Sequence, residues 1–211
     1  MTDIAAPPLA APPATAAEPA HVDGPPVIPE FTIVPRAGIV IAGVVLVLLV
    51  VAVAANKLWP LMFLHVVGGA GWTIVDLFVG LLIGPILGRL PLQSRIDFTT
   101  RFMPKMVVLM PILVATTLAA GWQLASHEGT NLIGDPVHGW IVASFIVVGV
   151  MAVLALGLLE PANIAVLIEL KKPRPNGQVI ERLMKRFVYC AGILGIMQVA
   201  TFVIMTHIAS S

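Results

Sequence analysis

Long apolar stretches separated by short polar segments dominate this sequence. An α-helix rises about 1.5 Å per residue, so about 20 apolar residues cross the ~30 Å hydrocarbon core of a bilayer. Five stretches reach that length, and the first is apolar on every side, which favours a peripheral position facing lipid. The pattern predicts an all-α fold, a polytopic transmembrane helix bundle. Its five predicted spans are about residues 37–56, 60–88, 103–125, 139–168 and 187–208.

The composition agrees with an integral membrane protein whose main partner is the lipid bilayer. Of the 211 residues, 58% are hydrophobic and 11% are charged, whereas soluble domains usually contain about 25% charged residues. The formal net charge of +1 gives no reason to expect a nucleic-acid partner. Cys190 is the only cysteine, which excludes an intrachain disulfide and a cysteine-built zinc site.

The first 35 residues differ from the rest of the chain. They contain nine of the eighteen prolines and show no apolar periodicity, so they cannot bury enough surface to offset the conformational entropy of ordering. We expect a disordered cytoplasmic tail over residues 1–35 and a transmembrane helical domain over residues 36–211.

Basic residues are concentrated in two of the polar connections. Residues 89–105 carry four of the twelve lysines and arginines, and residues 169–186 carry six more. Cytoplasmic loops are enriched in Lys and Arg, so both connections are predicted to face the cytoplasm. With five spans, the N-terminus is then cytoplasmic and the C-terminus extracytoplasmic. The prediction is a multi-pass protein of the plasma membrane, or inner membrane in bacteria.

The second span carries a stripe of polar and small residues. At about 100° per residue, His65, Gly69, Trp72 and Asp76 share one face. An aspartate facing hydrocarbon costs roughly 2.5 to 3.5 kcal/mol or more, so this stripe is predicted to face protein. The same face continues into a GxxxGxxxG motif at residues 80–88, which lets another helix approach closely, within the bundle or from another membrane subunit.

His65 and His138 are the candidate metal or cofactor ligands, and both are placed toward the extracytoplasmic side. Glycines follow His65 and leave a flat surface of the kind that a porphyrin beside an axial imidazole requires. Gly69 and Trp72 would then line the ring. The alternatives are a structural hydrogen bond for His65 and an interfacial position at a helix start for His138.

Asp76 and Glu160 are acidic residues within predicted spans, toward their cytoplasmic half. Either can relay protons, form an ion pair with Arg101 or Lys105, or remain a neutral buried acid. Methionines within several spans raise copper binding as an alternative, because thioethers suit Cu(I), although Met is also an ordinary apolar filler.

Three segments resemble a superfamily of small helical membrane proteins that includes the CopD-like domains and the HemJ-type protoporphyrinogen oxidases. The segments are LHVVGGAGW at 64–72, RFMPKMVVLMPILVATTLAAGWQLA at 101–125 and VHGW at 137–140, within about residues 60–145. The resemblance implies a four-helix core and, for the HemJ-like branch, haem b held by His65. The first span and the proline-rich tail lie outside that core.

The sequence leaves three classes of function open, and whether the protein is an enzyme is among the open points. The first is a haem-b-binding redox protein or an accessory subunit of a membrane redox complex, with His65 and His138 as axial ligands. The second is a copper-handling or proton-coupled transporter that uses Asp76 and Glu160. The third is a cofactor-free assembly subunit that docks onto a larger membrane complex through its glycine-rich helix faces.

Overall fold

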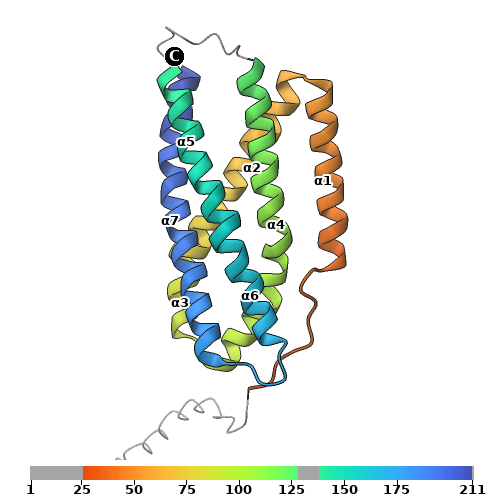
Figure 1. Ribbon diagram of the computed structural model, residues 1–211, viewed down its shortest axis with the longest axis vertical. Helices are drawn as coiled ribbons and strands as arrows, with labels where there is room; N and C mark the ends of the chain where they lie inside the picture. Colours follow the sequence, from red (N-terminus) through yellow and green to blue (C-terminus); the bar gives the residue numbers. More distant parts are fainter. Residues whose placement is uncertain (1–25, 128–137, 211) are drawn as a thin grey trace, which may run out of the picture.

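The computed structural model describes residues 26–127 and 138–210, and helices form nearly all of this part of the chain. Five helical rods, each long and apolar enough to cross a membrane, run side by side in a bundle (Figure 1). They confirm the predicted all-α, multi-span membrane fold. The rods are α1 (Arg36–Ala55); α2 (Leu58–Leu77) with η1 (Phe78–Ile83) and α3 (Gly84–Arg89); α4 (Leu92–His127); α5 (His138–Leu154) with η2 (Ala155–Leu159) and α6 (Glu160–Leu170); and α7 (Gly177–Ser210).

Two helices begin earlier than their apolar stretches suggested. The predicted third and fifth spans start near residues 103 and 187, whereas α4 starts at Leu92 and α7 at Gly177. Most of the basic residues that we assigned to connections therefore lie on the first turns of these helices. A hydropathy pattern ends where charges begin, but a helix continues beyond the bilayer as long as its backbone hydrogen bonds can form.

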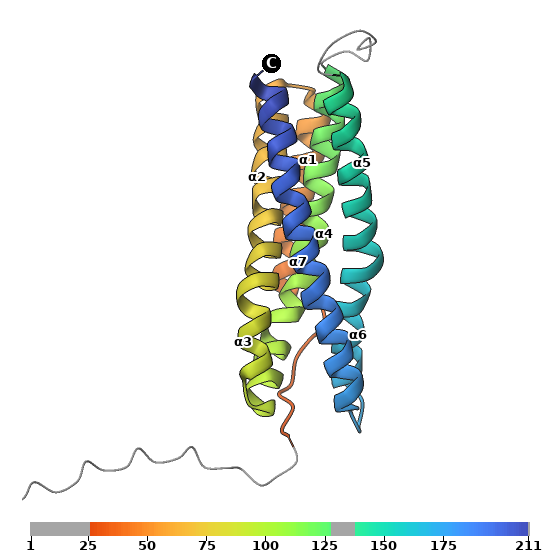
Figure 2. The same ribbon diagram turned by 90° about the vertical axis from the view of Figure 1, so that its left-hand side faces the viewer.

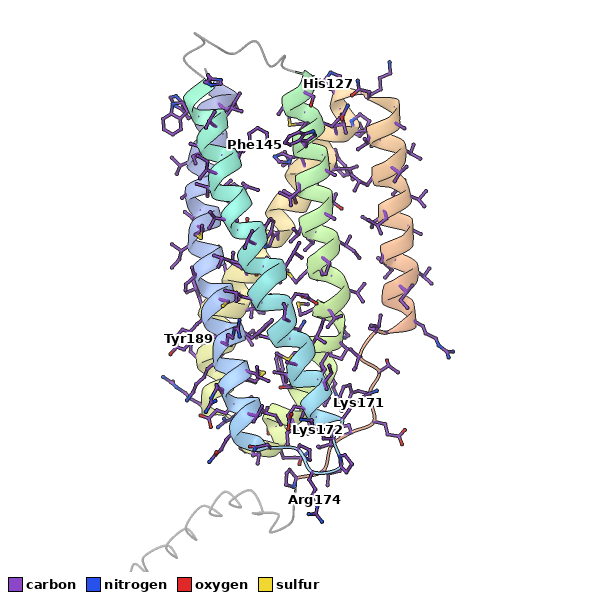
Figure 3. All side chains as sticks on the ribbon, viewed as in Figure 1. His127, Phe145, Lys171, Lys172, Arg174 and Tyr189 are labelled. Carbon is purple, nitrogen blue, oxygen red and sulfur yellow. The ribbon has the colours of Figure 1, made fainter. Side chains whose placement is uncertain are left out.

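Both basic regions lie at the same end of the bundle, as their charge predicted. Figure 1 shows the α3–α4 and α6–α7 connections together at this end, which we call the basic end, and the C-terminal end of α7 at the opposite end. Figure 3 shows Lys171, Lys172 and Arg174 at the basic end and His127 at the other. The chain therefore separates its positive charge by membrane side.

The segment over residues 26–35 is non-helical and runs along the bundle to the basic end (Figure 2). The Gln93 side chain bonds both backbone groups of Val27, with Nε2 donating to the carbonyl oxygen at 2.7 Å and Oε1 accepting from the amide at 2.9 Å. Phe31 packs against the main core, and Lys171 lies over its ring at 5.5 Å. This part of the tail, which we expected to be disordered, is held in place, and residues 1–25 lie outside the described part.

The core lies between the last four rods, and α1 packs beside them (Figure 1). Trp72, Val114, Met151 and Leu194 come from four different rods and are each at most 2% exposed. In α1 only two residues are buried. Most of the other α1 side chains are exposed, which agrees with the peripheral position predicted from its uniform apolarity.

The glycine motif of the second rod packs against α7 of the same chain. A Cβ atom at Gly80 would collide with the backbone of Gly192, and one at Gly84 would collide with the Val188 side chain. Gly88, the third glycine, has open space around its Cα. We considered this glycine surface as a contact for another membrane subunit. At Gly80 and Gly84 it is covered by α7 of the same chain, where it contributes to packing of the bundle.

Gly80→Ala is expected to destabilise the protein by about 1–3 kcal/mol, because the added methyl group must displace the backbone of α7. Gly88→Ala is the matched control, since the same change there meets nothing within 4 Å. Thermal unfolding in detergent would measure both. Equal effects of the two substitutions would contradict the packing described here.

Candidate functional site

Two carboxyl groups are buried away from the ends of the bundle, and a third, that of Glu169, is buried at the basic end, where it pairs with Lys172. Asp76 of α2 is 1% exposed and Glu160 of α6 is 8% exposed. Arg101 and Lys105, the predicted ion-pair partners, are exposed. Among residues 26–127 and 138–210, the ion pairs are Lys172–Glu169 and Lys185–Glu181, both toward the basic end. Within these residues, neither Asp76 nor Glu160 forms an ion pair.

Asp76 forms a hydrogen bond to a distant helix. Nε2 of Gln198, in α7, donates to its Oδ2 at 2.9 Å, and Gln198 itself is 3% exposed. Trp72 lies one helical turn before Asp76 on the same face and is also buried. The indole N–H of Trp72 and the amide oxygen of Gln198 have no hydrogen-bond partner within the described residues. The Asp76 end of the predicted stripe therefore faces α7, and three polar side chains, those of Trp72, Asp76 and Gln198, lie there in the core.

Both acids lie far from either end of the bundle. Asp76 is 18 residues from Leu58 and 13 from Arg89, which corresponds to about 27 Å and about 20 Å along the helix axis. Glu160 is 22 residues from His138 and 10 from Leu170, or about 33 Å and about 15 Å. Asp76 therefore lies near the middle of the bundle, whereas Glu160 lies closer to the basic end, within about one helical turn of the level of Met103.

Each acid also borders a π-helical segment, where the helix is wider than an α-helix. η1 begins two residues after Asp76, and η2 ends immediately before Glu160. Such segments are rare and frequently occur at functional sites. Our sequence analysis did not predict them.

A proline accompanies each of these segments. Pro85 and Pro161 each follow a π-helical segment at the start of the next α-helix. A proline has no N–H, and its ring clashes with the carbonyl group four residues earlier, here that of Leu81 or Gly157. The wider turn relieves that clash without breaking the rod. A proline alone does not predict such a turn, because Pro104 and Pro111 lie within α4, which remains an α-helix throughout.

His65 points toward α4 rather than toward lipid. Its Nδ1 lies 2.8 Å from the backbone carbonyl oxygen of Thr117. A carbonyl oxygen can only accept, so Nδ1 carries the proton and Nε2 is left with a lone pair. Gly121 makes this approach feasible, because a Cβ atom there would lie 2.7 Å from Nδ1. The structural hydrogen bond, one of our two alternatives for His65, is therefore present.

The glycines beside His65 do not form the open surface that we expected for a porphyrin. A Cβ atom at Gly68 would lie 2.8 Å from Oγ1 of Thr117, and one at Gly69 would touch the Cγ2 atom of the same threonine. A Cβ atom at Gly71 would lie 3.2 Å from the Leu113 side chain. Helix α4 covers this surface, so these glycines serve close packing of α2 on α4.

His138 lies apart from His65. It is the exposed first residue of α5. His65 lies level with Thr117, ten residues before the end of α4, which places it about 15 Å deeper along the axis. Within the described residues, no group of three or more His, Cys, Asp or Glu side chains is arranged to hold a metal ion.

The methionines that suggested copper are mostly core residues. Met103, Met106 and Met110 lie along one side of α4 and are at most 7% exposed within the main hydrophobic cluster. The sulfur of Met151 accepts a hydrogen bond from Oγ1 of Thr201 at 3.6 Å. These contacts are typical of methionine as an apolar filler.

The fold and these buried groups define the class: a multi-span helical membrane protein with two acidic residues and several polar groups in its core. Comparisons with known protein families, with curated proteins and with solved structures find no significant match. The function is therefore argued from the site itself.

Asp76→Asn is expected to change the free energy of unfolding by less than about 1 kcal/mol, because the asparagine oxygen can still accept from Gln198. Asp76→Leu is expected to cost about 1–3 kcal/mol, since it leaves the buried Gln198 amide without a partner. Glu181→Gln, at an exposed ion pair, is the control. A loss of about 3–5 kcal/mol for Asp76→Asn would instead indicate a buried ion pair.

Proposed function

We propose that this protein is a proton-coupled membrane transporter in which Asp76 binds and releases the coupling proton. The observation that carries the proposal is a carboxyl group that is 1% exposed, lies near mid-bundle and has a single neutral hydrogen-bond donor from another helix. Ionisable residues within membrane helices are rare and usually mark ion pathways.

The energetics favour a neutral Asp76 while the bundle is closed. A charged side chain at the bilayer centre costs roughly 2.5 to 3.5 kcal/mol or more, whereas hydrogen bonds between membrane helices average about 0.6 kcal/mol. The bond from Gln198 therefore cannot offset the cost of ionisation. Loss of the proton requires a change that brings water or a positively charged group to Asp76.

The position of Asp76 couples that change to helix packing. Its partner Gln198 lies on α7, and the close contact between Gly80 and Gly192 joins the same two rods about one turn away. The π-helical segment between Asp76 and α3 supplies a point at which the second rod can bend. A state in which these rods separate would ionise Asp76, so proton binding and bundle opening are linked equilibria.

The orientation follows from the two basic regions at one end of the bundle. We propose that this end faces the cytoplasm, with the C-terminus on the extracytoplasmic side, in a plasma or bacterial inner membrane. Protons would then be taken up through the end that carries His65 and released through the end that carries the segment over residues 26–35.

Purified protein in proteoliposomes is expected to move protons when a pH gradient and its substrate are supplied. Asp76→Asn is expected to abolish this flux, because an asparagine cannot release a proton, while the protein remains folded. Glu181→Gln serves as the matched control because Glu181 is exposed. A pH-sensitive dye trapped in the vesicles measures the rate. Full flux in the Asp76→Asn variant would reject the proposal.

A second candidate function, haem b binding at His65, is favoured by one specific observation. The hydrogen bond from Nδ1 to Thr117 leaves Nε2 as the coordinating nitrogen, and a backbone carbonyl is a usual partner for the second nitrogen of a metal-bound imidazole. The covered glycines and the separate position of His138 count against this candidate.

The haem candidate predicts a Soret band in the spectrum of the reduced protein that His65→Ala abolishes. His138→Ala is the control, and it keeps the band if His65 is the ligand that holds the iron. A purified protein that shows no Soret band after expression with a haem precursor would remove this candidate and leave the transporter proposal untouched.

A further inference from the structure

The first turn of α6 carries three buried oxygen atoms that accept no hydrogen bond within the described residues. They are both carboxyl oxygens of Glu160 and the amide oxygen of Asn163. Asn163 is 0% exposed. Buried polar atoms are nearly always hydrogen-bonded in folded proteins, because an unpaired one costs about 1–3 kcal/mol. Three such atoms on two side chains one helical turn apart need a hydrogen-bond donor.

The two side chains lie on the same face of α6. Residues three apart on a helix are neighbours, with about 5–6 Å between their Cβ atoms. The Asn163 amide nitrogen donates to the backbone oxygen of Met103 in α4 at 3.5 Å. A carbonyl oxygen can only accept, so the end of the amide that lies next to Met103 is the nitrogen. The amide oxygen is therefore directed away from Met103 and remains available.

One proton completes this set of acceptors. If Glu160 is a neutral acid, its O–H donates to the Asn163 oxygen one turn away, and two of the three unpaired atoms are satisfied at once. If Glu160 were ionised, a buried anion would have neither a hydrogen-bond donor nor an ion-pair partner among the described residues. We propose that Glu160 and Asn163 form a second proton-binding site, in which the proton on Glu160 is shared with the Asn163 oxygen.

This site is distinct from Asp76. The contact between Thr201 and Met151 sets the register of α7 against α5. Gln198 lies three residues from Thr201 toward the basic end, and Glu160 lies nine residues from Met151 in the same direction. The six-residue difference corresponds to about 9 Å along the axis, too far for the two acids to share one proton.

The segment over residues 26–35 lies on the basic-end side of this second site. Ile28, Phe31 and Ile33 pack against the core that also contains Leu167 and Leu170 of α6. Lys171, which follows α6, lies over the Phe31 ring, so this segment lies beside the basic end of α6. The existence of this proton-binding site does not depend on transport. Only the idea that protons pass Glu160 on their way to the basic end rests on the proposed function.

Infrared spectroscopy of the protein in lipid tests the bound proton directly. We expect a carbonyl band of a protonated carboxyl group that shifts in heavy water and disappears in Glu160→Gln. Asn163→Leu is expected to shift this band to higher frequency, because it removes the hydrogen-bond acceptor. Glu181→Gln should leave the band unchanged, and Asp76→Asn should remove a different band. A spectrum that Glu160→Gln does not alter would overturn the inference.

A second measurement needs no substitution and therefore does not depend on how a variant folds. Dicyclohexylcarbodiimide reacts with protonated carboxyl groups in apolar surroundings, and mass spectrometry locates the modified residue. We expect modification at Glu160 in the unaltered protein. No modification there, or protection by sodium ions at constant pH, would show an ionised or metal-bound carboxylate and overturn the inference.

The two proposals fail separately. A Glu160 band without any proton flux would reject the transporter and keep the second site. Flux that depends on Asp76 but is accompanied by an ionised Glu160 would keep the transporter and reject the second site.

Discussion

A buried carboxyl group that has no basic partner among the residues the structure describes is the constraint on which this bundle depends. Asp76 is buried between α2 and α7 and is bound through one amide hydrogen bond from Gln198. Hydrocarbon cannot solvate an anion, so the charge state of this residue and the packing of its two helices are linked. The functional proposal follows from that link more than from the fold, because helical bundles support many unrelated activities.

The glycine contacts hold the second rod against α7, and the two widened turns lie beside the buried acids. Gly80 and Gly84 bring the second rod into close contact with α7, which holds Asp76 against its partner. The π-helical segments lie beside the two acids, and each is followed by a proline, Pro85 or Pro161, in the next α-helix. The close glycine contacts lie within a few helical turns of Asp76, and a π-helical segment at which the helix can bend lies beside each of the two acids.

Local patterns in the sequence predicted what depends on local physics. Apolar length predicted the five spans, charge predicted that both basic regions share one end, and helical periodicity predicted that His65 and Asp76 face protein. The partner of Asp76 could not be predicted, because Gln198 is 122 residues away and its contact depends on how α2 packs on α7. The glycines after His65 misled us, since small residues suit a flat ligand and a close neighbouring helix equally well, and here α4 covers them.

Solid-state NMR of the protein in lipid bilayers, with labelled aspartate and glutamine, measures the central contact most directly. The carboxyl carbon of Asp76 reports its protonation state, and dipolar coupling to the side-chain nitrogen of Gln198 reports their distance. This account predicts a protonated carboxyl group within hydrogen-bonding distance of the Gln198 amide. An ionised Asp76 paired with an arginine or lysine nitrogen, and remote from Gln198, would contradict it.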